Sequence, residues 1–174
     1  MIFSLFRRKP QRDTISALYG MIVAQARLPV FYRDYTVADT VNGRFDLIVL
    51  HLALVLDRLT VEGQLDPAGQ AVFDRFCEDM DDNLREMGVG DLTVPKRMRK
   101  FGEAFYGRSA AYDAALEAGH AELAVALNRN IFNEADAANA DRLAAYVTEA
   151  LAHLGQIEQA AFVRGQWQFP AVRA

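Results

Sequence analysis

The sequence has 174 residues, of which 52% are hydrophobic and 24% are charged, which suits one globular domain with a hydrophobic core. Its formal net charge of −4 argues against a general affinity for nucleic acid. The single cysteine, Cys77, excludes an internal disulfide and a CxxC metal site, so a reducing compartment is favoured.

The first ten residues, MIFSLFRRKP, place apolar side chains ahead of a basic cluster. A secretory signal carries its positive charges first, and a membrane-spanning helix needs about 20 apolar residues. An apolar tip followed by basic residues suits the surface of an anionic membrane, whereas the alternative is an N-terminus that packs on its own domain. We separate residues 1–12 from the domain that follows, and the expected membrane-surface residues are Phe3, Phe6, Arg7, Arg8 and Lys9.

Apolar residues at three- and four-residue steps predict a first helix from about Asp13 to Arg27, capped by Asp13 or Thr14. Pro29 ends this helix, and the stretch from there to Asn42 is predicted to be a loop or a short irregular segment. Its aromatic residues either anchor the core or form a presented surface, and they are Phe31, Tyr32 and Tyr35.

A second helix is predicted from Gly43 to about Leu59, and its segment from Leu47 to Leu56 is apolar except for His51. Apolar residues on all sides indicate a central, buried helix, and the charged residues at both ends make it too short to span a membrane. A lone histidine on such a helix is usually held by hydrogen bonds. The alternative is that His51 has a catalytic or ligand-binding role.

The stretch FDRFCEDMDDNLREMGVGDLTVPKRMRKFGEAFYGR, residues 73–108, combines an acidic helix, a Gly-rich turn and a basic helix. Asp66 before Pro67 predicts the start of the acidic helix. Gly88 and Gly90 are expected to end it, with Gly88 in the left-handed conformation. The apolar face of this helix consists of Phe73, Phe76, Met80, Leu84 and Met87.

The basic helix is predicted over residues 94–118, with Thr93 as its candidate cap and Pro95 in its first turn. Gly102 and Gly107 inside this helix indicate close helix packing or a bend, because glycine is unfavourable in a helix interior. Its apolar side is expected to consist of Met98, Phe101, Phe105, Tyr112 and Leu116.

Because the turn between these helices is short, we expect them to fold back as a hairpin with a seam of both charge signs above an apolar layer. In that arrangement the basic first turns lie beside the acidic last turns. The alternative is that both are ordinary solvated helix faces, since exposed ion pairs contribute little to stability. The basic residues in question are Lys96, Arg97, Arg99 and Lys100.

Two further helices are predicted over residues 120–133 and 139–155, and no strand-like alternation extends over a useful length. The tail after residue 157 carries Phe162, Trp167 and Phe169, which are expected to tie the C-terminus onto the bundle. We predict an all-α, single-domain bundle of about six to seven helices over residues 13–170, with the charged hairpin at its centre.

Motifs of catalysis and metal binding are missing from the sequence. It contains no P-loop, GxGxxG, GxSxG, HExxH or CxxC motif, and its histidines lie on separate segments. Cys77 follows Phe76 on the acidic helix and reads as a small core residue rather than a nucleophile. We therefore expect no enzyme activity, no metal and no cofactor.

The run EDMDDNLREMGVGDLTVPKRMRKFGEAFYGR resembles the ubiquinol–cytochrome c chaperone family, as do ELAVALNRNIFN, LAAYV and the closing GQWQF. The resemblance extends from the first helix to Trp167. Its most specific parts are MGVGD at 87–91, KRMRK at 96–100 and FYGR at 105–108. One departure is Asn128 before Arg129, where mitochondrial relatives tend to place a tryptophan.

This resemblance implies an all-α assembly factor that binds newly made cytochrome b and helps to build ubiquinol–cytochrome c reductase, respiratory complex III. The resemblance also implies a cytoplasmic protein. Its implied contacts are a small partner protein, the ribosome exit region and the inner face of the cytoplasmic membrane. The chain looks like an alphaproteobacterial short form. Expected partner-binding residues are Asp82, Arg85, Met87, Asp91, Lys96, Arg97, Met98, Lys100, Tyr106 and Arg108, and expected backbone or turn residues are Gly88, Gly90, Pro95 and Gly107.

Two other hypotheses follow from the residues alone. The apolar helix around His51 would suit a helical module that binds a lipid, a quinone or a haem without catalysis. The basic helix over residues 94–118 would suit nucleic acid, but the acidic net charge disfavours specific nucleic-acid binding.

Overall fold

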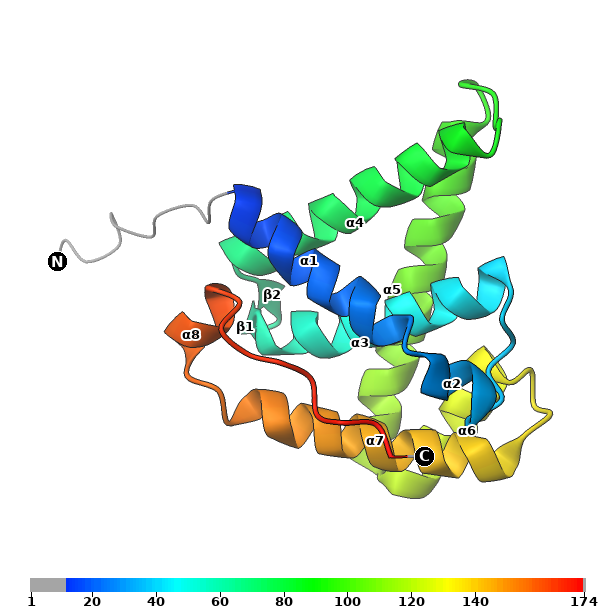
Figure 1. Cartoon of the computed structure of the whole chain (residues 1–174), viewed down its shortest axis with the longest axis vertical. Coiled ribbons are helices and arrows are strands. Elements are labelled where there is room, and N and C mark those ends of the chain that lie inside the picture. Colours follow the sequence, from blue (N-terminus) through cyan, green and yellow to red (C-terminus); the bar gives the residue numbers. More distant parts are fainter. Residues whose placement is uncertain (1–11, 174) are drawn as a thin grey trace, which may run out of the picture.

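The computed structural model describes residues 12–173, and its elements are labelled in Figure 1. They are α1 (Arg12–Ala26), α2 (Pro29–Arg33), α3 (Val41–Arg58), β1 (Thr60–Val61), β2 (Gln64–Leu65), α4 (Pro67–Glu86), α5 (Val94–Ala118), α6 (His120–Ile131), α7 (Ala137–Gly155) and α8 (Gln159–Val163).

The all-α prediction is confirmed. The two strands have two residues each and form a minimal antiparallel hairpin, in which Thr60 lies opposite Leu65. Strands this short produce no alternating pattern, which is why the sequence predicted only a loop there. The expected membrane-surface residues Phe3, Phe6, Arg7, Arg8 and Lys9 lie outside the described residues.

The other long helices pack around α3, which contacts α1, α4, α5, α6 and α7 (Figure 1). Every residue from Asp46 to Leu52 is buried. A helix that is apolar on all sides requires neighbours on all sides, and this arrangement supplies them. The central position expected for the charged hairpin therefore belongs to α3.

The start of α3 is fixed by a cap and by a close backbone contact. The Thr40 hydroxyl accepts a hydrogen bond from the Gly43 N–H at 3.1 Å, so the helix begins at Val41, two residues before the predicted start. A Cβ atom on Gly43 would lie 2.0 Å from the carbonyl oxygen of Ala38. Only glycine fits this position without moving the preceding loop.

His51 lies fully buried in a chain of hydrogen bonds. Its Nδ1 lies 2.7 Å from the Leu47 carbonyl oxygen and donates to it, so its Nε2 accepts from the Tyr146 hydroxyl at 2.9 Å. Gln25 donates to the same hydroxyl at 2.9 Å. Burial lowers the pKa of His51 to about 4, which keeps the ring neutral near pH 7. The structural interpretation of His51 is therefore confirmed.

Two of the three aromatic residues between α1 and α3, Phe31 and Tyr35, are buried core anchors, whereas Tyr32 is half-buried. Phe31 in α2 is fully buried and packs edge-on against the rings of His51 and Tyr146. The Tyr35 hydroxyl donates to the carbonyl of Arg173 at 3.0 Å, which ties this segment to the C-terminus. The expected irregular segment also contains α2, which is too short to show a periodic pattern.

The C-terminal aromatic residues hold the tail on the bundle, as predicted. Trp167 stacks on Phe162 with ring centroids 4.6 Å apart, and its Nε1–H donates to the Phe162 carbonyl at 2.9 Å. Phe169 packs edge-on against His51. This tail runs along α7 and away from the turn between α4 and α5 (Figure 1).

The predicted caps have mixed outcomes. Asp66 caps α4, because its side chain accepts from the N–H groups of Ala68 and Gly69 at 2.9 and 2.8 Å. Thr93 occupies the position before α5, but its side chain makes no capping hydrogen bond. Asp13 and Thr14 lie inside α1, so the prediction that one of them caps it is wrong.

One segment of the described chain, Arg12–Arg33, is long and apolar enough by composition to cross a membrane. In the fold this segment forms α1 and α2. The apolar stripe of α1, which includes Leu18 and Ile22, is buried, and α1 packs on α3 and α4. The apolar composition of this segment is therefore also that of a helix packed in the core of the fold.

Replacing Gly43 with alanine is expected to destabilise the protein by about 2 kcal/mol or more, because the new methyl group must displace the backbone at Ala38. The matched control is Gly20→Ala on α1, where a Cβ meets nothing within 4 Å and helix propensity predicts a gain of about 0.5–1 kcal/mol. Urea unfolding of both variants measures the difference. Equal stability of the two variants would contradict the crowded start of α3.

Candidate functional site

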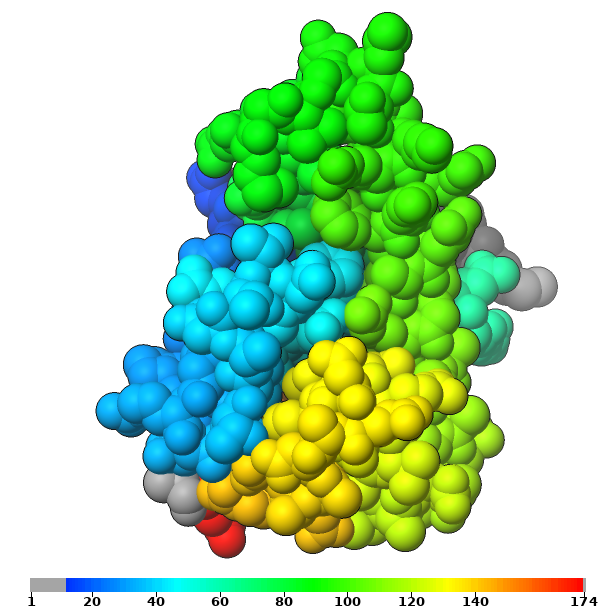
Figure 2. All heavy atoms as spheres, turned by 90° about the vertical axis from the view of Figure 1, so that its right-hand side faces the viewer, coloured from blue at the N-terminus to red at the C-terminus, as the bar shows by residue number. Residues whose placement is uncertain are grey.

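The candidate site lies on the helical hairpin formed by α4 and α5, whose turn projects from one end of the molecule (Figures 1 and 2). The end of α4 is a Schellman motif with Gly88 at a φ of +77°. The N–H of Val89 donates to the Leu84 carbonyl at 3.0 Å, and that of Gly88 donates to the Arg85 carbonyl at 2.9 Å. The prediction of a left-handed Gly88 is confirmed.

Arg85 holds the turn in place. Its guanidinium group pairs with Asp81 one turn earlier and with Asp91 in the turn itself, each at 2.5 Å. Both Arg85 and Asp91 were expected to bind a partner. In the structure they pair with each other. Either side chain could therefore pair with a partner protein only after this ion pair had broken.

Large aromatic side chains fill the space between the two helices. Phe73 of α4 lies 5.0 Å from Phe105 and 5.7 Å from Tyr106 of α5, measured between ring centroids. Phe101 packs on Phe45 of α3 at 5.0 Å. The helices meet at the turn and diverge from there (Figure 1). The predicted apolar layer of the hairpin is therefore present and wedge-shaped, but Met87, which was expected in it, is 57% exposed.

The expected seam of paired charges between the two helices is wrong. Within residues 12–173, no ion pair joins an acidic residue of α4 to a basic residue of α5. Two of the pairs on these helices stay within one helix, Arg75–Glu78 in α4 and Arg99–Glu103 in α5. The charged side chains on both sides of the turn are exposed to solvent, namely Asp82, Glu86, Lys96, Arg97 and Lys100.

The exposed end of the hairpin combines apolar and charged side chains, and it forms the upper end of the molecule in Figure 2. Leu92 is 98% exposed and Met87 is 57% exposed. Isolated exposed apolar residues are common, but an almost fully exposed leucine at a projecting turn marks a contact surface. We call this surface the hairpin tip, and it consists of Asp82, Met87, Leu92, Lys96, Arg97 and Lys100, all of them exposed.

Leu92 was not among the residues predicted from the sequence. It stands in the turn between Gly90 and Thr93, where no helical period applies. The available signal was an apolar residue inside a Gly- and Pro-containing turn, where polar residues usually stand. Met98, a predicted contact residue, is half-buried against the core, and Pro95 is exposed in the first turn of α5.

Tyr106 lies farther along α5 and is 61% exposed, with its ring against Phe73 and Phe105. Gly107 is exposed beside it, and a Cβ atom at Gly102 or Gly107 would meet nothing within 4 Å. The prediction that these glycines allow close helix packing is therefore wrong, and α5 is continuous through both.

Arg108 points into the fold rather than toward a partner. Its guanidinium group pairs with Asp46 of α3 at 2.7 Å, and the two side chains are only 24% and 11% exposed. The same group lies over the ring of Phe45 at 5.7 Å. This pair joins α5 to the central helix, so Arg108 positions the hairpin and does not form part of its outer surface.

The described residues contain no group of three or more histidine, cysteine, aspartate or glutamate side chains placed to hold a metal ion. Cys77 is half-buried, and burial raises the pKa of its thiol, which disfavours the nucleophilic thiolate. For His51 to bind a haem iron, its hydrogen bond to Tyr146 would have to break.

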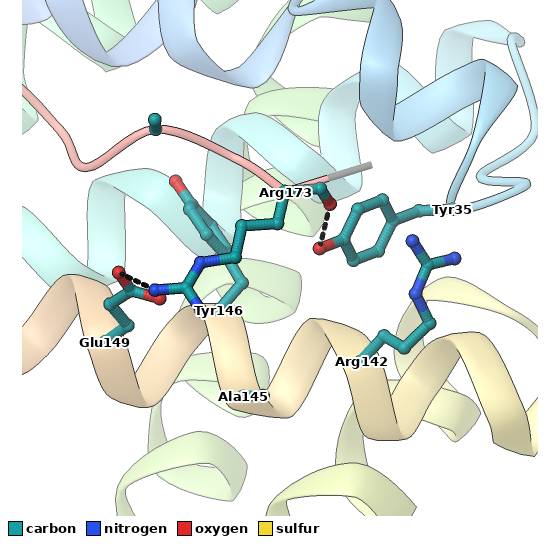
Figure 3. Close-up of a pocket in the computed structure, with 7 residues that line it drawn as sticks. Tyr35, Arg142, Ala145, Tyr146, Glu149 and Arg173 are labelled. Carbon is teal, nitrogen blue, oxygen red and sulfur yellow. Dashed lines mark hydrogen bonds and ion pairs between the residues drawn. The ribbon is translucent and has the colours of Figure 1, made fainter.

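A small pocket of about 200 Å³ lies between α7 and the C-terminal tail (Figure 3). Arg173 reaches across it to Glu149 at 3.3 Å, and Arg142 covers the ring of Tyr35 at 4.4 Å. Its volume is below the usual range of about 300–1,000 Å³ for ligand sites. The pocket therefore offers no support for the quinone- or haem-binding hypothesis.

Comparison with known proteins identifies the family of this chain. The family model for "Ubiquinol-cytochrome C chaperone" matches residues 33–169, which include the whole hairpin. The crystal structure of the Cbp3 homolog from Brucella abortus is similar, with a TM-score of 0.84 and 40% sequence identity, over 99% of this chain and 98% of that one.

Curated relatives include ubiquinol-cytochrome-c reductase complex assembly factor 1 of Xenopus laevis, which is 28% identical over 121 residues, 67% of this chain and 59% of that protein. The Mus musculus protein of that name is 27% identical over 140 residues, 79% of this chain and 48% of its own length. The Drosophila melanogaster protein is 29% identical over 159 residues, 86% and 61% of the two lengths. The chain thus spans about half to three-fifths of these relatives.

Replacing Asp46 with asparagine is expected to change how stability depends on pH. Burial raises the pKa of the Asp46 carboxyl to about 6, and Arg108 offsets this only in part. Its contribution to stability is then complete below the unfolded-state pKa near 3.8 and is lost as the pH rises through about 6. The free energy of unfolding of the wild type, relative to Asp46→Asn, should fall by about 2–3 kcal/mol from pH 4 to pH 7 in urea titrations.

The control for this measurement is Asp39→Asn. Asp39 is an exposed carboxylate, paired with Arg44 at 2.7 Å, and this pair lowers its pKa. The stability that this pair contributes rises with pH up to about pH 5 and is constant above it, so the difference from wild type should not fall between pH 4 and pH 7. The same slope in both variants would contradict the assignment of the pH effect to Asp46.

Proposed function

The chain belongs to the ubiquinol-cytochrome C chaperone family, and from that membership we propose that it assists the assembly of ubiquinol–cytochrome c reductase, respiratory complex III. The family model covers residues 33–169, and the curated relatives carry assembly of this complex in their names. The proposed activity is binding without catalysis.

The proposed client is newly made cytochrome b, and the proposed binding surface is the hairpin tip. The observation that carries this proposal is the exposed Leu92 on a turn that is closed by the Schellman hydrogen bonds and by the Arg85–Asp91 pair. A turn with a defined backbone loses less conformational entropy on binding than an open loop, which favours affinity from its apolar contacts. Met87 extends this apolar surface.

The charges around the tip suit a membrane-protein client. Cytoplasmic loops of membrane proteins are rich in lysine and arginine, which exposed carboxylates such as Asp82 can pair with. Lys96, Arg97 and Lys100 on the other side can pair with acidic loop residues or with lipid phosphates. Because these charges are not paired across the hairpin, they are available to a partner.

The motif residues therefore divide into two groups under this proposal. One group contacts the client, and the other builds and orients the surface. The proposed contact residues are Asp82, Met87, Leu92, Lys96, Arg97, Lys100 and Tyr106, and the proposed building residues are Arg85, Gly88, Gly90, Asp91, Pro95, Met98, Gly107 and Arg108.

We further propose that the protein works in the cytoplasm at the inner face of the cytoplasmic membrane, where a newly inserted client is accessible. A small partner protein and the ribosome exit region are proposed second contacts. The C-terminal tail leaves the hairpin tip uncovered, so several partners could share the molecule (Figure 1).

The double change Leu92→Asp and Lys96→Glu is expected to reduce co-purification of cytochrome b from the cell's own membranes about fivefold or more, because it removes an apolar anchor and reverses a charge. Both side chains are exposed, so unfolding transitions should match wild type. The control is Val125→Asp on α6, which is 63% exposed and distant from the hairpin turn in the sequence.

Deleting the whole gene tests the assembly role separately from the hairpin tip as the binding site. Unchanged cytochrome b after deletion would refute the assembly role. Reduced cytochrome b after deletion, with full binding by the double variant, would keep the role and refute the hairpin tip as the site.

A further inference from the structure

A second surface feature lies away from the hairpin tip, beside α2, where α1 ends and α3 begins (Figure 1). A pocket of about 370 Å³ opens there. Most of its charged lining is basic, in a protein whose net charge is −4. The lining residues are Arg27, Pro29, Tyr32, Arg33, Asp39 and Arg44.

Three guanidinium groups face one carboxylate in this pocket. Arg44 pairs with Asp39 at 2.7 Å, but Arg27 and Arg33 form no ion pair within residues 12–173. Like charges held in one concave surface repel each other, and a bound anion would relieve that repulsion.

The walls of the pocket are held in place by bonds that leave the two unpaired arginines available. The Tyr32 hydroxyl donates to the Ala26 carbonyl at 2.9 Å, which fixes α2 against the end of α1. Arg44 is paired with Asp39, and Pro29 restricts the backbone between α1 and α2. A ligand would therefore meet a backbone already in place, and only exposed side chains would need to adjust.

We propose that this pocket binds a phosphate group, with Arg27 and Arg33 as its direct ligands and Arg44 as a third, oriented cation. The planar guanidinium group donates two parallel hydrogen bonds to phosphate oxygens, which a lysine cannot do. A phosphate group has three or four oxygens that can accept hydrogen bonds, whereas a carboxylate has two. Three arginines around one concave surface therefore suit a phosphate ligand better than a carboxylate ligand.

A neighbouring apolar residue favours a phospholipid headgroup as the source of this phosphate. Val41 is 71% exposed and stands three residues before Arg44, on the same side of α3. An exposed apolar side chain beside a phosphate site suits the boundary between headgroups and acyl chains. The pocket would then orient the protein on a membrane.

The test uses the full chain and two phosphate sources. Inorganic phosphate is titrated against chloride at equal ionic strength, and the arginine Nε–H signals are followed by NMR. Sedimentation with phosphatidylcholine vesicles, with or without phosphatidylglycerol, tests the lipid. Arg33→Ala should weaken phosphate binding about tenfold, because it removes a charge-assisted pair of hydrogen bonds.

Arg164→Ala is the matched control, since it removes one exposed positive charge at the end of α8 and should leave binding unchanged. Weaker vesicle binding by Arg33→Ala supports a lipid source, and an effect on inorganic phosphate alone supports a soluble one. Equal behaviour of the two variants with both ligands would overturn the proposal. Phosphate binding by the purified chain requires no cytochrome b, so failure here would leave the proposed function untouched.

Discussion

The burial of α3 on all sides is the constraint on which the rest of the fold depends. A helix with Leu47, Leu50 and Val55 on different faces is stable in water only when neighbours cover each face. α1 and α4 cover one side, and α5, α6 and α7 cover the others. Two polar side chains inside this core have partners that offset part of the cost of burial, since His51 is hydrogen-bonded to Tyr146 and Asp46 pairs with Arg108.

The same constraint explains why one end of the molecule is free to bind a partner. α4 and α5 are longer than the segments needed to cover α3, so their shared turn extends beyond the core (Figure 1). Local bonds among Asp81, Arg85 and Asp91 then stabilise a turn that has little support from the rest of the protein. The core thus anchors the hairpin, and the turn presents the exposed side chains.

Most long helices could be predicted from the sequence because three- and four-residue apolar spacing reports a buried face directly. The five-residue helices α2 and α8 could not, since they contain little more than one turn. The direction of Arg108 could not be predicted either. Its partner Asp46 is 62 positions away, and a charged residue in a basic motif reads as exposed until that partner is known. Divergence of α4 and α5 depends on the packing of bulky rings such as Phe73 and Phe105, which periodicity does not describe.

The long sequence separation between His51 and its partners has a consequence for synthesis of the protein. Tyr146 follows His51 by 95 positions and Phe169 follows it by 118, yet all three rings pack together. While the ribosome is still translating the segment between them, α3 has no cover on that side and the unfinished polypeptide exposes an apolar helix. The side of α3 that faces Tyr146 and Phe169 is therefore covered only after both residues have been synthesised, so the core is completed late.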